Sequence, residues 1–256
     1  MREKSPLCYV GGKSLLARTI IEHLPPHETY CEPFAGAGWV LFKKAPSKYE
    51  VLNDINGDLV SFYKVLKYHL EEFVRQFKWC LASREWWEDW NRQMAAGGLT
   101  DIQRAARYYY VQRGGFGGKV TGRTFGAGPR QHPRVNLLRI EEDLSDCHLR
   151  LAQVVIEHLC YKDVLRRYDT LETCFYLDPP YWDCESFYGQ GIFSKEDFHQ
   201  LSAQLAEIKG KFLLSLNDKP QVREIFKPFS IIPLKTRYTC GRTTPKEANE
   251  VLIKNF

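Results

Sequence analysis

The order of apolar runs and turns near the N-terminus constrains the fold more than any other feature. Residues 27–34, HETYCEPF, have the pattern of a strand that enters a turn, and residues 36–45, GAGWVLFKKA, that of a turn that opens a helix. Residues 49–56, YEVLNDIN, then have the pattern of a second strand that ends in an acid. Strand, helix and strand in this order begin a doubly wound sheet, so the sequence predicts an α/β fold.

The alternation of strand and helix patterns breaks off at about residue 57 and resumes after about residue 148. Residues 57–148 have mostly helical patterns that are rich in Trp, Tyr and Arg. We therefore predict one α/β domain in two pieces, 1–56 and 149–256, interrupted by an inserted helical domain. The segments that continue the alternation are QVVIEHLCYKDVLRRY (153–168), TCFYLDPPY (173–181), SKEDFHQLSAQLAEI (194–208), KFLLSLND (211–218), FSIIPLKTRY (229–238) and NEVLIKNF (249–256).

The insertion contains a stretch without acidic residues. No Asp or Glu occurs between Asp101 and Glu141, and most of the cations there are arginine, whose fork fits phosphates and guanine edges. Rings interleaved with such cations on a glycine-rich segment favour a nucleic-acid contact surface; a solvated, flexible loop is the alternative. The cations are Arg104, Arg107, Arg113, Lys119, Arg123, Arg130, Arg134 and Arg139, and the rings are Tyr108, Tyr109, Tyr110, Phe116 and Phe125.

Composition excludes several other classes of protein. The 8 cysteines form no Cys-x-x-Cys pair and no Cys/His cluster with zinc spacing, so we expect reduced thiols and no metal. No uncharged stretch approaches the roughly 20 apolar residues of a membrane span, and residues 1–20 lack the apolar core of a signal peptide. We therefore expect a cytoplasmic protein with no membrane partner. The formal charge of +5 is modest, and its distribution says more than its size.

The turn EPFAGAGW, residues 32–39, predicts a cofactor site. Gly36 and Gly38 stand where a strand feeds a helix, so the backbone and the helix start can approach a ligand closely. Asp54 follows 18 residues after Gly36, at the end of the next strand, where a carboxylate can accept both hydroxyls of a ribose. The alternatives are small residues that serve packing and an Asp54 that only caps the next helix.

Three classes of cofactor can be compared with this pattern. YVGGKS at 9–14 is no phosphate-binding P-loop, because its first glycine would have to be residue 7, which is leucine. A nicotinamide site calls for a third glycine at residue 41, which is also leucine. S-adenosylmethionine has no pyrophosphate, and its positive sulfonium suits a site with carboxylates such as Glu32, Asp54 and Asp178.

Four motifs in order resemble a known family over nearly the whole chain. YVGGK at 9–13, EPFAGAG at 32–38, a carboxylate at Asp54 and, after a long insertion, DPPY at 178–181 are similar to those of the Dam-type (alpha-class, D12) DNA adenine N6-methyltransferases. The resemblance implies a Rossmann-like core that uses S-adenosylmethionine, with an inserted, mainly helical target-recognition domain. It also implies methyl transfer to the exocyclic amine of an adenine flipped out of a short site in double-stranded DNA.

The resemblance also implies roles for individual residues. The Asp178 carboxylate and the Pro179 carbonyl would accept from both N–H groups of the amine, Pro180 would restrict the backbone, and Tyr181 would stack on the base. For Asp163 the alternative is an ordinary acid at a helix start, and for Lys13 a solvated lysine. The implied cofactor contacts are Tyr9, Lys13, Glu32, Pro33, Phe34, Ala35, Gly36, Gly38, Asp54, Asp163 and Asp178.

The insertion departs from the pattern of relatives that read GATC. It has QRGGFGG at 112–118 and RTFGAGP at 123–129, without the expected Asn and Val-Pro elements, so GATC and another short site both stay open. Ser215 and Asn217 would line the base pocket or cap a turn. The implied DNA contacts are Arg113, Phe116, Lys119, Arg123, Phe125 and Arg130.

Alternative functions remain at this stage. Cytosine-N4 methylation uses the same kind of amine, usually with Ser in place of Asp178. A catalytically silent DNA-binding protein on the same fold and a nicotinamide oxidoreductase are the other two. A cytosine-C5 enzyme is disfavoured because no Pro-Cys pair occurs. We expect a prokaryotic or phage-encoded monomer; a restriction endonuclease partner, a regulatory role and a phage role stay open.

Overall fold

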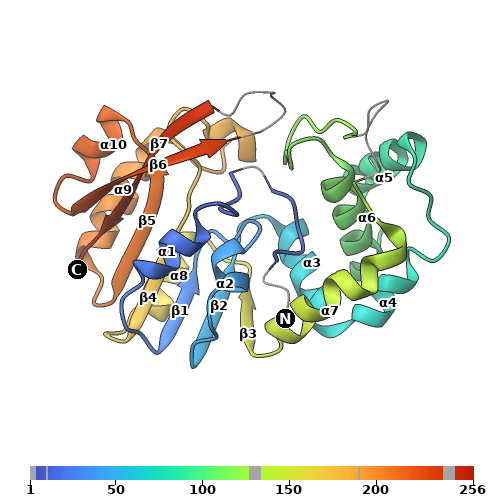
Figure 1. Ribbon diagram of the computed structural model, residues 1–256, viewed down its shortest axis with the longest axis horizontal. Coiled ribbons are helices and arrows are strands. Elements are labelled where there is room, and N and C mark those ends of the chain that lie inside the picture. The colour runs from blue at the N-terminus through green and yellow to red at the C-terminus, as the bar shows by residue number, and fades with distance from the viewer. Residues whose placement is uncertain (1–3, 10, 127–133, 190, 239–245) are drawn as a thin grey trace.

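A single sheet of seven strands forms the centre of the computed structural model, which describes residues 4–9, 11–126, 134–189, 191–238 and 246–256 (Figure 1). Its strand order is β3-β2-β1-β4-β5-β7-β6, with β6 and β7 paired antiparallel at one edge and the other strands parallel. The strands are β1 Thr29–Glu32, β2 Tyr49–Asn53, β3 Val154–Glu157, β4 Thr173–Leu177, β5 Lys211–Asn217, β6 Ser230–Tyr238 and β7 Lys246–Lys254.

The strand order places a topological switch point between β1 and β4. From β1 the chain moves outward through β2 and β3, and from β4 it moves the other way through β5. β1 and β4 lie in parallel register, with Cys31 opposite Phe175, so their carboxyl ends meet at the same edge of the sheet. In open α/β sheets, ligands bind at the crevice outside such a switch point.

Helices cover both faces of the sheet, as the doubly wound prediction requires. The buried side chains of α1, α2 and α3 share one hydrophobic cluster with one face, and those of α8, α9 and α10 share a second cluster with the other face. The helices are α1 Ala17–Glu22, α2 Trp39–Lys43, α3 Gly57–Tyr68, α4 Leu70–Arg75, α5 Arg84–Ala96, α6 Asp101–Gly114, α7 Ile140–Leu151, α8 Tyr161–Tyr168, α9 Lys195–Glu207 and α10 Pro220–Ile225, with 3-10 turns η1 Leu137–Arg139 and η2 Glu185–Tyr188.

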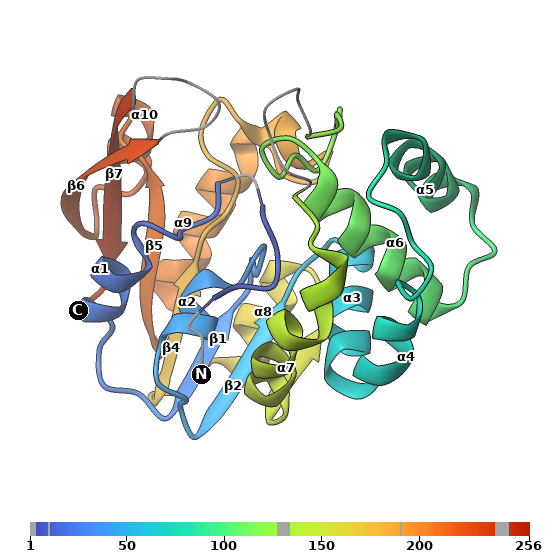
Figure 2. The ribbon, with the colours of Figure 1, turned by 45° about the vertical axis from the view of Figure 1, so that its right-hand side comes forward.

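The predicted insertion forms the helices on the right in Figure 1, and Figure 2 shows α3, α6 and α7 lying together there. Their core is aromatic: the Tyr109 ring stacks on Phe62 with 5.7 Å between centroids and meets Phe73 edge-on at 5.6 Å. This cluster is continuous with the one that covers the α1–α2 face of the sheet. The helices from α3 onward therefore pack as an extension of that face, and their role as a target-recognition domain stays a prediction.

One interpretation of the sequence is corrected by this core. The adjacent rings of Tyr108, Tyr109 and Tyr110 favoured a surface for nucleic acid, but all three are at most 2% exposed. They lie on α6, which begins at a capping box between Thr100 and Gln103 and packs against both α3 and α5. A buried ring cannot stack on a base, so these three rings serve to hold the helices together.

No helix in the described part of the chain is long and apolar enough to cross a membrane.

Candidate active site

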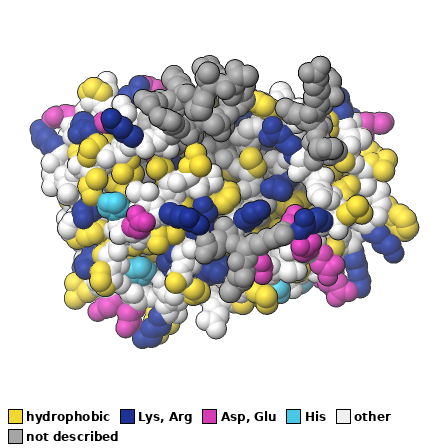
Figure 3. Space-filling model, in the orientation of Figure 1, with side chains coloured by type: hydrophobic (Ala, Val, Ile, Leu, Met, Phe, Trp, Pro, Cys, Tyr) yellow, Lys and Arg dark blue, Asp and Glu magenta, His cyan; other side chains and the backbone are white. Residues whose placement is uncertain are grey.

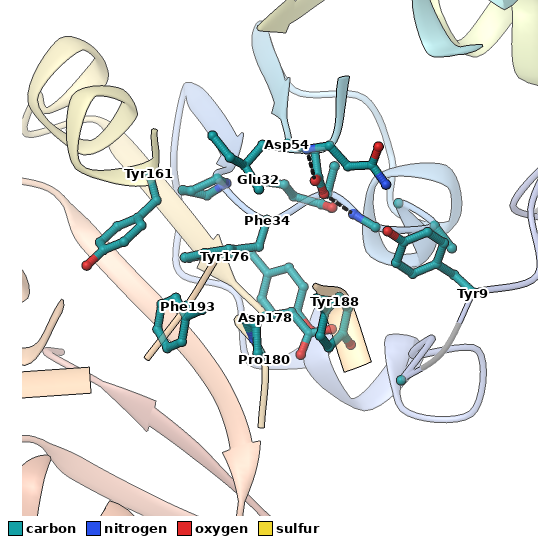
Figure 4. Close-up of a pocket in the computed structure, with 18 of the residues that line it drawn as sticks. Tyr9, Glu32, Phe34, Asp54, Tyr161, Tyr176, Asp178, Pro180, Tyr188 and Phe193 are labelled. Carbon is teal, nitrogen blue, oxygen red and sulfur yellow. Dashed lines mark hydrogen bonds between the residues drawn. The ribbon is translucent and has the colours of Figure 1, made fainter. Parts of the chain in front are cut away.

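An open cavity lies at the carboxyl ends of β1, β2 and β4, at the switch point of the sheet (Figure 4). The N-terminal segment, the turn after β1 and the segment after β4 all contribute to its walls. The fold therefore brings together, around one cavity, most of the cofactor-binding and catalytic residues that the sequence predicted, although they lie far apart in the chain. The predicted residues that line the cavity are Tyr9, Lys13, Glu32, Pro33, Phe34, Ala35, Gly36, Gly38, Asp54, Asp178 and Pro180.

Asp54 is fixed in position by the glycine turn. Its carboxylate accepts hydrogen bonds from the backbone N–H of Gly36, at 3.0 Å, and of Asn56, at 2.9 Å. The helix cap is Asn56, whose side chain accepts from the first N–H groups of α3, so the alternative of Asp54 as the cap is wrong. Burial raises the pKa of the Asp54 carboxyl above its usual value, although its hydrogen bonds from Asn56 and Gly36 partly offset this.

Glu32 contributes a second carboxyl group to the floor of the cavity. It is 2% exposed, and its Oε1 accepts from the Tyr30 hydroxyl and from the backbone N–H of Leu41, each at 2.8 Å. Burial raises the pKa of Glu32 to about 8. At neutral pH this carboxyl is therefore mostly protonated, and it adds less negative charge to the cavity than its sequence position suggests.

An aromatic wall closes one side of the cavity. The ring of Phe34 lies 5.2 Å from that of Tyr161 and 5.9 Å from that of Phe193, and Figure 4 shows Tyr161 and Phe193 on the left, across the cavity from Tyr9. Tyr161 and Phe193 were not predicted, because they belong to segments after β3 and β4 that meet Phe34 only in the folded protein.

Asp163 does not lie in this cavity. It sits in the first turn of α8, where its side chain is 51% exposed and pairs with Arg166 at 2.8 Å. The structure thus matches the alternative interpretation, an acid at a helix start. Residues Leu159, Cys160 and Tyr161, just before it, line the cavity instead.

Asp178 follows β4 directly and is the most highly connected carboxylate of the site. Lys13 Nζ lies 2.7 and 2.8 Å from its two oxygens, and Ser215 Oγ donates to Oδ1 at 2.9 Å. The Tyr176 hydroxyl is in turn 3.0 Å from Ser215 Oγ. Burial raises the pKa of Asp178, and the Lys13 ammonium opposes this rise. Lys13 is thus a buried partner of the carboxylate, and the alternative of a solvated lysine is wrong.

The residues that follow Asp178 are held by β5 and β7. Asn217 accepts from the backbone N–H of Trp182 and donates to its carbonyl, each at 3.0 Å. The Tyr181 hydroxyl donates to Glu250 Oε2 at 2.7 Å, and Lys13 Nζ lies 4.6 Å from the centre of the Tyr181 ring. The interpretation of Asn217 as a turn cap is therefore wrong; it holds the DPPY segment.

The glycine-rich part of the insertion packs directly on the N-terminal segment of the cavity. Residues 114–126 fold back on themselves, with Gly115 bridged to Phe125 and the Phe116 N–H donating to Thr124. Gln112 donates to the carbonyls of both Cys8 and Gly118. A Cβ atom on Gly118 would lie 2.7 Å from the backbone nitrogen of Tyr9, so only glycine allows this contact.

The predicted DNA contacts divide into exposed and enclosed side chains. Phe116 and Lys119 are exposed, and the Arg123 guanidinium lies over the Tyr108 ring at 5.8 Å. Phe125 packs against Trp87 at 6.0 Å, and Arg113 is half-buried on α6, where its charge opposes the rise that burial causes in the pKa of Tyr109. Arg130 lies outside the described residues. Among the described residues, no three His, Cys, Asp or Glu side chains gather as they would around a metal ion.

Comparisons with known proteins agree with this geometry. The model of the D12 class N6 adenine-specific DNA methyltransferase family matches residues 9–240. The chain is 27% identical to a DNA adenine methylase of Salmonella typhi, over 98% of this chain and 95% of that protein. It is 23% identical to the Type II methyltransferase M.CviBI of Paramecium bursaria Chlorella virus NC1A, over 96% and 97%. It is also 27% identical to a DNA N-6-adenine-methyltransferase of Escherichia phage P1, over 98% of this chain and 35% of that protein.

Proposed function

Because the chain belongs to the D12 class N6 adenine-specific DNA methyltransferase family, we propose that it methylates the exocyclic amine of an adenine flipped out of a short site in double-stranded DNA. The methyl donor is S-adenosylmethionine. The observation that carries the proposal is the position of Asp178: its carboxylate lies in the same cavity as Asp54, at the switch point of the sheet. A cofactor that binds Asp54 and a base that binds Asp178 would therefore be neighbours in the same cavity.

The chemistry of the cavity fits S-adenosylmethionine. When bound, it supplies an electrophilic methyl group on a positively charged sulfonium. The Asp54 carboxylate, fixed by the N–H groups of Gly36 and Asn56, keeps acceptor capacity for the hydroxyls of a ribose. Phe34 and its two aromatic neighbours form an apolar surface for a planar base. Glu32, which also lines the cavity, adds polar atoms there without a full negative charge at neutral pH.

Asp178 has the hydrogen-bond geometry for the methyl-transfer step. The amine of adenine is a weak nucleophile, because its lone pair is delocalised into the ring. As its nitrogen attacks, positive charge grows on it, and a fixed carboxylate stabilises that charge without reorganising. Ser215 holds one oxygen of this carboxylate, and the prolines at 179 and 180 restrict the backbone that carries the second acceptor, the Pro179 carbonyl.

Lys13 has a defined part in this arrangement. The Lys13 side chain is 4% exposed and that of Asp178 is 20% exposed, so the ammonium and the carboxylate balance each other's charge where either would be costly alone. A base amine that binds Asp178 takes over hydrogen bonds that Lys13 makes. The ammonium is then in place to donate to Gly11, which it already contacts at 3.0 Å.

DNA recognition is assigned to the glycine-rich part of the insertion. Phe116 and Lys119 are exposed there, and Lys and Arg side chains cross the middle of the face in Figure 3, between the strands on the left and the helices on the right. Cations that contact phosphates supply affinity that is independent of sequence. We retain Arg123 and Arg130 in the proposed DNA contacts, and we assign Phe125 a supporting part, because its ring packs against Trp87. We assign Arg113 a supporting part, because its side chain is half-buried on α6 between the helices of the insertion.

The test is methyl transfer to duplex DNA from S-adenosylmethionine labelled in its methyl group, followed by nucleoside analysis of the product. The proposal predicts that the label appears in N6-methyladenine, and sequencing that detects methylated bases then gives the recognition site. Label in N4-methylcytosine would replace this proposal with its nearest alternative. DNA binding without any transfer would indicate a silent DNA-binding protein.

A further inference from the structure

Two side chains that face each other across adjacent strands hold the tail of the DPPY motif. Asn217 on β5 and Glu250 on β7 are register partners in the antiparallel part of the sheet. Asn217 holds the backbone of Trp182 through two hydrogen bonds of 3.0 Å, and Glu250 accepts from the Tyr181 hydroxyl at 2.7 Å. Consecutive residues after the prolines are thus fixed by one pair of strand residues.

We propose that Asn217 and Glu250 form a positioning clamp that sets the orientation of the Tyr181 ring against the target base. This inference rests on the function proposed above. The prolines at 179 and 180 restrict the backbone before Tyr181, and Asn217 fixes it after Tyr181. The side chain still has two free torsions, and a ring without a bonded hydroxyl can turn about both. The bond to Glu250 removes this freedom.

The position of Lys13 shows where the clamped ring faces. Lys13 Nζ lies 2.7 Å from an oxygen of Asp178 and, at the same time, 4.6 Å from the centre of the Tyr181 ring. A group bound to the Asp178 carboxylate is therefore within stacking distance of Tyr181. A base whose amine takes the place of the ammonium would lie against this face, so the ring angle affects how the amine meets Asp178.

Burial makes the bond between Glu250 and Tyr181 strong enough to matter. Glu250 is 1% exposed, and a buried carboxyl group is costly unless its oxygens accept hydrogen bonds. A tyrosine hydroxyl that donates to a buried carboxylate makes one of the stronger side-chain bonds in proteins. Glu250 lies 69 residues from Tyr181 in the chain, which is why the sequence alone gave no sign of it.

A double-mutant cycle tests the clamp. Glu250→Gln and Tyr181→Phe should each lower kcat about tenfold, the effect of losing one bond to a charged group. The dissociation constant of S-adenosylmethionine should not change. Gln leaves only a neutral acceptor for the Tyr181 hydroxyl, and Phe removes that hydroxyl. Because both changes act on the same bond, the double variant should be no slower than the slower single variant. Effects that multiply to about a hundredfold, or a Glu250→Gln variant with unchanged kcat, would overturn the clamp.

A matched control is available in the same molecule. The Tyr168 hydroxyl donates to Glu157 at 2.6 Å, away from the cavity. Glu157→Gln replaces the charged acceptor of a tyrosine hydroxyl in the same way and should leave kcat within about twofold, because this half-buried side chain does not line the cavity. An equal loss of kcat in Glu157→Gln would mean that Glu250→Gln acts through general stability.

A second readout separates failure of the clamp from failure of the proposed function. In protein with ring-labelled tyrosine and no DNA, Glu250→Gln should shift the carbon resonance that disappears in Tyr181→Phe and leave the other tyrosine signals in place. An unshifted Tyr181 resonance would refute the clamp even in an active enzyme. If the wild-type protein transfers no methyl group, the proposed function fails, and the shift still decides whether Glu250 orients Tyr181.

Discussion

The cavity and the insertion use their ionisable side chains in opposite ways. Around the cavity, Glu32, Asp54 and Asp178 each accept two or more hydrogen bonds that aim them into one shared space. In the insertion, several arginines bind neighbours within the protein. Arg104 pairs with Asp58 and Arg139 pairs with Glu142. The carboxyl groups of the cavity are therefore already held in position before a ligand binds. In the insertion, the number of arginines in the sequence overstates the surface that is available to DNA, because some of them pair within the protein.

The aromatic side chains show the same difference. Phe34 and its neighbours line an open cavity where a ligand can reach them. Tyr108, Tyr109 and Tyr110 are enclosed by helices, and of the predicted DNA-contacting rings Phe116 is the one classed as exposed among the described residues. Rings are therefore accessible to a ligand in one region and enclosed in the core in the other, and the changes below separate these two uses.

The largest effect should come from Asp178→Ala. Removing the group that stabilises charge on the amine should lower the single-turnover transfer rate by about 10³-fold, the size found for lost transition-state hydrogen bonds. The dissociation constant of S-adenosylmethionine, measured by calorimetry, should change little. Because Lys13 would then be a buried cation without this partner, Lys13→Met should be combined with the change as a check on folding. Near-normal turnover would remove Asp178 from the mechanism.

Tyr109→Ala should give the next largest effect, on stability. The ring packs against Phe62, Phe73 and Phe77, so its loss should lower the free energy of unfolding by about 3 kcal/mol. Phe116→Ala is the matched control, because this exposed ring should contribute less than about 0.5 kcal/mol. Denaturant unfolding of both variants gives the comparison. Equal losses in the free energy of unfolding would show that Phe116 stabilises the fold as much as Tyr109 does, and would contradict the difference between the two rings.

The raised pKa of Glu32 predicts a pH-dependent stability. Between the unfolded value of about 4.3 and the native pKa of about 8, the folded protein holds a proton that the unfolded chain has released. The contribution of Glu32 to the free energy of unfolding therefore falls as pH rises, by about 2 kcal/mol from pH 5.5 to 7.5. Unfolding of the wild type and of Glu32→Gln at both pH values isolates this contribution. A difference that does not vary with pH would mean an ordinary pKa.

The smallest of these effects should be on cofactor binding, where Asp54 and Asp163 are compared as ligands. Asp54→Ala should weaken S-adenosylmethionine binding by at least about tenfold, because a bond to a charged group is lost. Asp163→Ala should change it by less than about twofold, since this exposed acid lies outside the cavity. Calorimetric titration of both variants measures the contrast. A larger effect at Asp163 would reverse the structural assignment.

The sequence predicted the features that depend on local pattern. Asp54 and Asp178 directly follow strands, and Gly36 lies in the turn after β1. Parallel strands bring their carboxyl ends to one edge, so these residues had to meet if the strand assignments were correct. The doubly wound α/β fold and the family followed from the same motifs, and both are confirmed.

Features that depend on distant contacts could not be predicted. Glu250 reaches Tyr181 only because β7 inserts antiparallel between β5 and β6. A run of tyrosines has the same appearance in sequence whether its helix faces a core or solvent, which is why Tyr108 and its neighbours were assigned to a surface. The proposed role of Asp163 failed to find support for a related reason, because one turn of helix decides which side chain faces the cavity.

The most direct test of the account is a crystal structure of the protein with an unreactive cofactor analogue and a duplex that contains its recognition site. The quantity to measure is the distance from the amine nitrogen of the flipped base to the Asp178 carboxylate. The account predicts adenine there, with this distance near 3 Å, the usual length of such a hydrogen bond, and with Tyr181 against the face of the base. A cytosine at Asp178, or an adenine still stacked in the duplex while both ligands are bound, would contradict it.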